Sequence, residues 1–381
     1  MTTVGTADSA HEGTGRGGAL EVPEELGRGR LRSRILTLAA IVAIVIAIVT
    51  LAPGLGSLRA RLAHLQPSWL ALGAALKLLS GLSYVLVFRA VFCRRMSWRV
   101  STEIGLSELG ANAVFPTGGA GGLALGAWVL RRGGMSGQHI AKRTVAFFLL
   151  TSVPNVVGVI VLGVALALGA FPTHPELVLA LVPAVAGIAA IAGALLAGRA
   201  AAAGRLRFAR RASGARGRST KVLGAIAEGV DEAVMLLRRH DRQLILGAIG
   251  YLAFDVMILW ATFRAVGASP ALEVIWFAYL IGELGGLLPL PGGIGGVDAG
   301  LIGTLVLYGA ALAPTTAAVL AYRAIALWVP AVAGGIAFIT LRRTLNREAH
   351  QIAMCEPGEE VDVIGIGPVV IGATAGGHRT T

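Results

Sequence analysis

Two glycine-rich segments that contain proline interrupt otherwise apolar parts of this sequence. The first contains Pro116, Gly118, Gly119 and Gly121, and the second is the run Pro291-Gly292-Gly293-Ile294-Gly295-Gly296. Proline and glycine at this density break a helix. A helix that restarts after the break points free backbone N–H groups and its positive dipole end at it, which suits a phosphate or carboxylate. We therefore expect these prolines and glycines to bind an anionic substrate, the alternative being that the glycines only allow tight helix packing or a kink.

Carboxylic acids flank both breaks inside the apolar segments. Glu108 precedes the first break, Glu283 precedes the second, and Asp298 follows the second. An aspartate inside a membrane costs about 2.5–3.5 kcal/mol on insertion scales, so it usually has a partner or a function. Glu108 and Glu283 could carry protons or stabilise their segments through hydrogen bonds, and Asp298 could instead cap the second half-helix. We interpret all three as coupling or structural acids.

Three basic or acidic side chains lie deeper in other apolar segments. Arg323 either contacts an anionic headgroup, pairs with Asp298 or Glu283, or extends its guanidinium to the membrane surface. We include Arg323 among the expected substrate-binding residues. Lys77 and Asp255 are each interpreted as pairing with some partner inside the helix bundle, the alternative being a functional role.

The composition is that of a helical membrane protein. Of 381 residues, 55% are hydrophobic and 14% are charged, and the mean hydropathy is +0.74. This is too apolar for a soluble domain, and several windows are long enough to cross a bilayer. The net charge of +12 comes almost wholly from arginine, and we attribute it to positive-inside topology and anionic lipid rather than to nucleic acid. We predict an all-α polytopic membrane bundle.

Several chemistries find no support in the residue pattern. The two cysteines, Cys93 and Cys355, indicate neither a disulfide framework nor a metal site, and no histidine–cysteine cluster has metal-ligand spacing. The absence of a Gly-Lys dipeptide excludes a P-loop in this chain. We expect no catalytic residue, no metal and no cofactor.

Clusters of arginine set the expected topology. Arginines precede the first apolar run, and Arg342 and Arg343 follow the last, so both termini are expected to be cytoplasmic. The expected spans are 35–52, 69–92, 144–169, 177–197, 244–266 and 315–341, with broken hairpins over 103–130 and 272–312 and a surface helix over 220–240. The expected domains are a disordered N-terminus 1–34, a membrane domain 35–343 and a disordered tail 344–381.

The membrane domain contains an internal repeat. Phe88-Arg89-Ala90-Val91 recurs from Phe263, Glu108-Leu109-Gly110 recurs from Glu283, and Pro116, Gly118 and Gly121 recur as Pro291, Gly293 and Gly296, always 175 residues later. We place repeat 1 at about 69–198, a basic linker at 199–243 and repeat 2 at 244–343. Because the expected topology turns the second copy over, the repeat is expected to be inverted, as in many secondary transporters with midplane sites.

With these residues assembled, the chain resembles the flippase-like transmembrane family of the lysylphosphatidylglycerol synthase membrane region. The resemblance covers about 35–343 and rests on the run from Pro291 to Val297-Asp298, on Tyr322-Arg323, on Trp328-Val329-Pro330, and on Asn112, Pro116 and the following glycines. Asp298 stands where the family usually has glutamate. The first hairpin of the family often carries an acid and an arginine after its glycines, where this chain has Gly122, Leu123 and Leu125.

The resemblance implies a flippase that moves an anionic or zwitterionic phospholipid between the leaflets of a bacterial inner membrane. Membrane lipids are then the expected partners, nucleic acid is not, and a second copy or a separate lipid-modifying enzyme is a further candidate. Full synthases add a soluble domain that transfers lysine from tRNA, but only about forty residues follow the last span here, so we expect no lysyltransferase activity. The alternative function is a membrane enzyme, or an enzyme's partner, in lipid or cell-envelope glycan metabolism.

Overall fold

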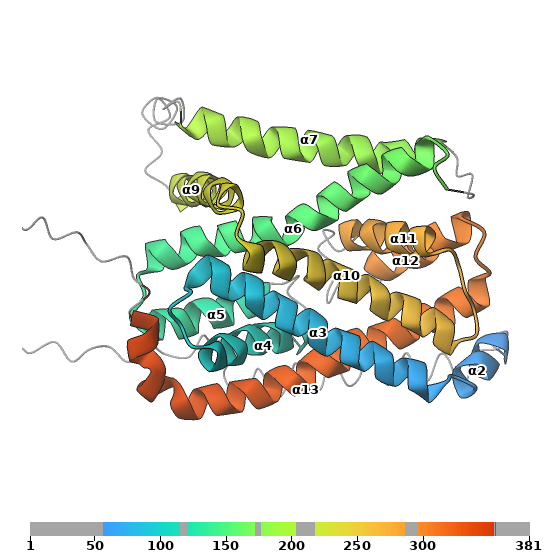
Figure 1. Cartoon of the computed structure of the whole chain (residues 1–381), viewed down its shortest axis with the longest axis horizontal. Coiled ribbons are helices and arrows are strands. Elements are labelled where there is room, and N and C mark those ends of the chain that lie inside the picture. Colours follow the sequence, from blue (N-terminus) through green and yellow to red (C-terminus); the bar gives the residue numbers. More distant parts are fainter. Residues whose placement is uncertain are drawn as a thin grey trace, which may run out of the picture.

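The computed structural model describes residues 56–114, 120–171, 177–202, 218–285, 296–353 and 355. Within these ranges the chain has helices and no strands, which confirms the predicted all-α membrane bundle. The helices are α2 (Gly56–Ala63), α3 (Pro67–Phe92), α4 (Trp98–Val114), α5 (Ala120–Arg132), α6 (Gly137–Ala167), α7 (Leu177–Ala202), α9 (Arg218–Arg238), α10 (Arg242–Ala265), α11 (Leu272–Gly285), α12 (Gly296–Leu307) and α13 (Leu312–Ala353) (Figure 1).

Four helices in the described part of the chain are long and apolar enough to cross a membrane, namely α3, α6, α10 and residues Leu312–Thr344 of α13. They coincide with four of the predicted spans, and α7 covers a fifth, 177–197. The predicted span 35–52, the predicted N-terminal region 1–34 and the tail beyond Cys355 lie outside the described residues.

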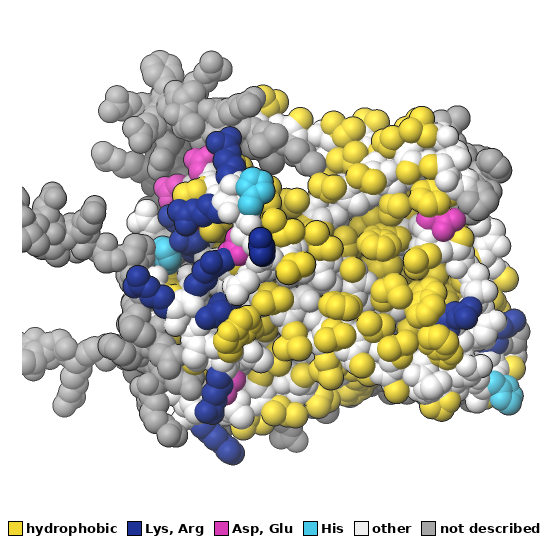
Figure 2. Space-filling model, in the orientation of Figure 1, with side chains coloured by type: hydrophobic (Ala, Val, Ile, Leu, Met, Phe, Trp, Pro, Cys, Tyr) yellow, Lys and Arg dark blue, Asp and Glu magenta, His cyan; other side chains and the backbone are white. Residues whose placement is uncertain are grey.

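The outer surface of the bundle is apolar in the middle and basic at one end. Large apolar side chains such as Leu246 and Ile336 are exposed at 67% and 61%, as suits contact with lipid. Figure 2 shows apolar side chains over the middle of the molecule and most lysine and arginine side chains near the end where α3 finishes and α10 begins. We call this the basic end and the opposite one the far end.

Helix bounds follow the spacing of the repeat. Helices α3 and α10 begin at residues 67 and 242, and α6 and α13 begin at 137 and 312, so both pairs differ by 175. The starts of α4 and α11 differ by 174, and those of α5 and α12 by 176. Four consecutive helices of the first half therefore have counterparts in the second.

The first helices of the two halves pack against each other in opposite directions. The Gln66 N–H donates to the Ala265 carbonyl over 3.1 Å at the far end, while a Cβ atom on Gly247 would lie 2.9 Å from Leu86 Cβ near the basic end. Residue numbers rise along α3 as they fall along α10, so the pair is antiparallel. An inverted repeat requires this arrangement, and the orientation of the two halves across a membrane stays a prediction.

The two short hairpins occupy opposite halves of the bundle. Figure 1 shows α4 and α5 in the half nearer the basic end, and α11 and α12 in the half nearer the far end. Helix α4 packs on α13, and α11 packs on α6. Each hairpin therefore packs on the fourth of the four matched helices of the other half. A Cβ atom on Gly110 would lie 2.8 Å from Gly334 Cα, which shows how closely the backbones of α4 and α13 approach.

The predicted helix over 220–240 is present as α9, which Figure 1 shows almost end-on at the basic end. It therefore runs across the direction of the long helices. Glu232 of α9 bonds with Lys142 and Arg143 of α6 over 3.0 and 3.1 Å, and these ion pairs fasten α9 to the bundle. Its contact with a membrane surface stays a prediction.

The expectation that the cysteines form no disulfide is wrong. Cys93, directly after α3, is bonded to Cys355, with their Cα atoms 5.5 Å apart across a sequence separation of 262. The bond forms because α3 and α13 both end at the basic end. Helix α13 also continues ten residues past the predicted boundary at 343, and Ile352 is fully buried against Gly133.

The disulfide predicts a thiol-labelling result. In the oxidised chain neither of its two cysteines should react with a polyethylene-glycol maleimide in SDS, whereas prior reduction should give two labels, seen as gel shifts. Cys93→Ser should accept one label without reduction, because Cys355 then lacks its partner. Two labels on the unreduced wild-type chain would contradict the bond.

Candidate functional site

Four charged residues of the long and broken helices lie at a common depth. Lys77 and Asp255 are each ten residues from the far end of their helices, and Glu283 and Arg323 are each eleven residues from theirs. At 1.5 Å per residue this is about 15–17 Å, or roughly half of a 30 Å hydrocarbon layer. All four therefore lie near the middle of the bundle.

Lys77 and Asp255 form a buried ion pair between α3 and α10. The Lys77 ammonium donates to both carboxylate oxygens of Asp255, over 2.8 and 3.1 Å, and the two side chains are only 9% and 6% exposed. The Tyr279 hydroxyl of α11 donates to Asp255 Oδ2 over 3.4 Å. These bonds link three helices. The expectation that each charge has a partner inside the bundle is confirmed, and the structure shows that the two are each other's partners.

Arg323 and Asp298 form a second ion pair beside the break of the second hairpin. Arg323 Nε of α13 donates to Asp298 Oδ1 over 2.5 Å, and the side chains are 30% and 25% exposed. Asp298 lies in the first turn of α12, where the helix dipole stabilises a carboxylate. Of the roles expected for Arg323, pairing with Asp298 is present in the structure.

Glu283 lies next to both ion pairs and is exposed. Its carboxylate interacts with the charges of Asp255, Arg323 and Lys77, and it is in hydrogen-bonding contact with Tyr279. We call the group the interior polar cluster, made up of Lys77, Asp255, Tyr279, Glu283, Asp298 and Arg323.

The cluster has a small net charge. With its lysine, arginine and three carboxylic acids all ionised, two cations and three anions give it a formal charge of −1. Glu283, Asp298 and Arg323 form its accessible side, and Lys77 and Asp255 form its closed side.

The first hairpin has a different polar interior. Glu108 is 2% exposed and accepts a hydrogen bond of 2.8 Å from the Tyr84 hydroxyl. The Gly122 N–H donates to Asn112 Oδ1 over 2.7 Å, which joins the start of α5 to α4. A Cβ atom on Gly122 would lie 2.4 Å from the Glu108 carbonyl oxygen, so glycine here allows the two half-helices to pack. Glu108 is thus a closed counterpart of the accessible Glu283.

Comparison with known families agrees with a membrane protein. Residues 35–334 match the family model described as "Lysylphosphatidylglycerol synthase TM region". The chain belongs to this family. No curated protein matches the chain in direct sequence comparison.

The structure gathers part of the expected site of this family member. Glu283, Asp298 and Arg323 come together, whereas Glu108 lies in the other hairpin. Gly121 is within α5, and Gly296 is the first residue of α12. Seven expected ligands lie outside the described residues, namely Pro116, Gly118, Gly119, Pro291, Gly292, Gly293 and Gly295.

The sequence analysis did not identify two tyrosines as partners of the interior carboxylates. Tyr84 and Tyr279 each bond a carboxylate from a neighbouring helix. A signal was present, because both lie within apolar helices, and a buried phenol hydroxyl usually has a hydrogen-bond partner. Which carboxylate each tyrosine meets depends on how the helices pack.

The buried ion pair predicts a non-additive effect on stability. Lys77→Met should lower the free energy of unfolding by about 3–5 kcal/mol, because it leaves the Asp255 carboxylate buried without its cation. Lys77→Met/Asp255→Leu should be close to wild type, because apolar residues often replace a buried pair without loss. The measurement is the fraction that stays monodisperse on gel filtration after heating in neutral detergent. If the double variant were as unstable as Lys77→Met, loss of the ion pair would not be the cause of the lower stability.

The contact between α4 and α5 predicts opposite effects at two helical glycines. Gly122→Ala should destabilise the protein by about 1–3 kcal/mol, because the new methyl group meets the Glu108 backbone. Gly303→Ala in α12 is the matched control, because no atom lies within 4 Å of its added Cβ. This control should be neutral or slightly stabilising, since alanine favours a helix more than glycine does. The same heating assay checks both, and equal melting of the two variants would refute the packing role of Gly122.

Proposed function

We propose that this protein is a membrane lipid flippase that moves an anionic or zwitterionic phospholipid between the two leaflets. The supporting observation is the accessible side of the interior polar cluster, where Arg323, Asp298 and Glu283 meet at mid-depth beside a helix break. Charged groups in the middle of a membrane protein commonly mark a transport pathway. Membership of a family of membrane regions agrees with this reading.

The charges of the cluster favour a headgroup that carries both signs. The guanidinium of Arg323 can bind a phosphate through two parallel hydrogen bonds. Glu283 and Asp298 are available for an ammonium group, and the formal charge of −1 disfavours a headgroup with no positive charge. A zwitterionic phospholipid therefore fits this site better than a purely anionic one.

The helix arrangement supports alternating access to that site. The hairpins approach the middle of the bundle from opposite ends, and the first helices of the two halves are antiparallel. Transporters with inverted repeats move one half against the other around a midplane site. In the proposed orientation the basic end faces the bacterial cytoplasm, together with both termini. The proposal assigns no catalytic residue, no cofactor and no lysyltransferase activity.

Reconstitution into liposomes with fluorescent lipids tests the function. Chemical quenching of the outer leaflet would follow translocation of labelled phosphatidylethanolamine and phosphatidylglycerol. We expect transport by the wild type, a loss of at least about tenfold in Arg323→Ala, which corresponds to 1.4 kcal/mol, and little change in Arg264→Ala. Arg264 is the matched control because it stacks near Trp69 and Trp260 at the far end, away from the cluster.

A double variant separates headgroup binding from a purely structural role of Arg323. Arg323→Met/Asp298→Leu removes both partners, so no unpaired charge is left in the bundle. If Arg323 contacts the headgroup, this variant folds but does not transport. Full transport by the double variant would show that Arg323 only pairs with Asp298 and does not contact the headgroup. No transport by the wild type, combined with a change of lipid mass, would favour the alternative of a membrane enzyme.

A further inference from the structure

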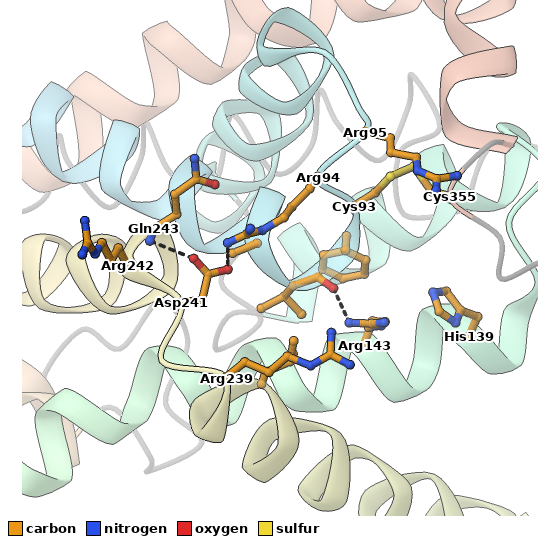
Figure 3. A pocket seen from close by; sticks show the side chains of 14 residues that line it. Cys93, Arg94, Arg95, His139, Arg143, Arg239, Asp241, Arg242, Gln243 and Cys355 are labelled. Carbon is orange, nitrogen blue, oxygen red and sulfur yellow. Dashed lines mark hydrogen bonds and ion pairs between the residues drawn. A yellow bond between two sulfur atoms is a disulfide. The ribbon is translucent and has the colours of Figure 1, made fainter.

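A second polar site lies at the basic end, away from the interior polar cluster. It is a cavity of about 920 Å³ between the end of α3, the start of α6, the end of α9 and the start of α10 (Figure 3). Phe92 in its wall is 15 residues beyond Lys77 on α3, a rise of about 22 Å. The cavity is large enough for an organic ligand, since such sites commonly measure about 300–1,000 Å³.

The cavity wall concentrates positive charge. Its arginines are Arg94, Arg95, Arg143, Arg239 and Arg242. Asp241 is the one acid in the wall, so five positive charges less one negative charge leave +4. Figure 3 shows that Arg94, Arg143 and Arg239 approach the same space from three different parts of the chain.

Among the described residues, carboxylates pair with two of these arginines. Arg94 pairs with Asp241, and Asp241 also accepts the Gln243 N–H over 2.9 Å as the cap of α10. Arg143 donates to the Val91 carbonyl over 2.7 Å and pairs with Glu232. Within the described part of the chain, the other three arginines have no ion pair with a carboxylate.

Two guanidiniums of the wall repel each other. Arg239 lies close enough to Arg143 for the two guanidiniums to interact unfavourably. Positive-inside topology alone explains arginines spread over an exposed surface, such as Arg342 and Arg343 on α13. Four arginines of the wall are exposed as well, namely Arg94, Arg95, Arg239 and Arg242. Positive-inside topology does not explain why they gather with Arg143 around one concavity, where a bridging anion would relieve the repulsion.

The wall also has an apolar part, beside the polar residues His139 and Gln243. Val91, Phe92 and Leu236 are buried beside the arginines. We propose that this cavity binds a phosphate-bearing anion, with guanidiniums on the phosphate oxygens and the apolar wall against the organic part. Arginine is suited to this task because its planar fork matches phosphate geometry. The ligand is either the headgroup of an anionic lipid or a soluble organic phosphate, and the site does not depend on the proposed transport function.

Binding to the full chain in neutral detergent tests the inference. Native mass spectrometry and calorimetry would follow three probes: dioctanoyl phosphatidylglycerol, net-neutral dioctanoyl phosphatidylcholine, and inorganic pyrophosphate. We expect the wild type to bind the phosphatidylglycerol or the pyrophosphate, and Arg95→Gln/Arg239→Gln to bind it at least tenfold more weakly. Arg342→Gln/Arg343→Gln is the matched control, because it removes two exposed arginines outside the cavity.

Each outcome of these binding measurements either supports or overturns the proposed anion site. Selective binding of phosphatidylglycerol that only the cavity variant loses identifies a lipid site, and the same pattern for pyrophosphate identifies a soluble ligand. No binding of either anion, equal binding of phosphatidylcholine, or equal weakening by both double variants would overturn the proposal. If the double variant does not fold, Arg95→Gln and Arg239→Gln are measured separately, and affinity unchanged in both also overturns it. A transport-inactive protein that still binds the anion would reject the flippase function and leave this site intact.

Discussion

The ion pair between Lys77 and Asp255 fixes the register on which the interior of this protein depends. A lysine and an aspartate at mid-depth can be buried only together, because either charge alone would be strongly destabilised in a low dielectric. Their bonds of 2.8 and 3.1 Å therefore define how α3 lies on α10. Asp255 also accepts from Tyr279, and this contact places the end of α11, with Glu283, at the same level. Apolar packing supplies most of the contact between these helices, and the charges select one alignment of it.

The two hairpins contain similar residues, but these residues have different roles in each hairpin. In the first, Glu108 is enclosed by Tyr84 and by the glycine face of α5, so its carboxylate has no open side. In the second, Glu283 is exposed, and Arg323 and Asp298 are each about a quarter to a third exposed beside it. One half of the repeat thus stabilises the bundle, while the other presents charges that a headgroup can reach. This asymmetry is the physical basis for placing the proposed lipid site in the second half.

Charge is arranged by depth along the bundle. The middle holds a nearly balanced set of cations and anions, as a low-dielectric environment requires. The basic end holds a cavity with a surplus of four positive charges, and the Cys93–Cys355 disulfide and α9 lie beside it. A phosphate-bearing ligand is compatible with both places, but for different reasons. At mid-depth its charge is matched by specific partners, whereas at the basic end it neutralises a local excess.

The sequence by itself determined the helical membrane class, the 175-residue spacing and the positions of five predicted spans, because apolar length and glycine–proline breaks are local properties. It also pointed to Glu283, Asp298 and Arg323 as one group, with pairing of Arg323 among the stated alternatives. Only the tertiary structure decided that Lys77 meets Asp255, that Tyr84 encloses Glu108, and that Cys93 reaches Cys355. The partners of the first and last of these contacts are 178 and 262 residues apart. Such contacts depend on which helix faces pack and on which ends meet, and neither is encoded in local periodicity.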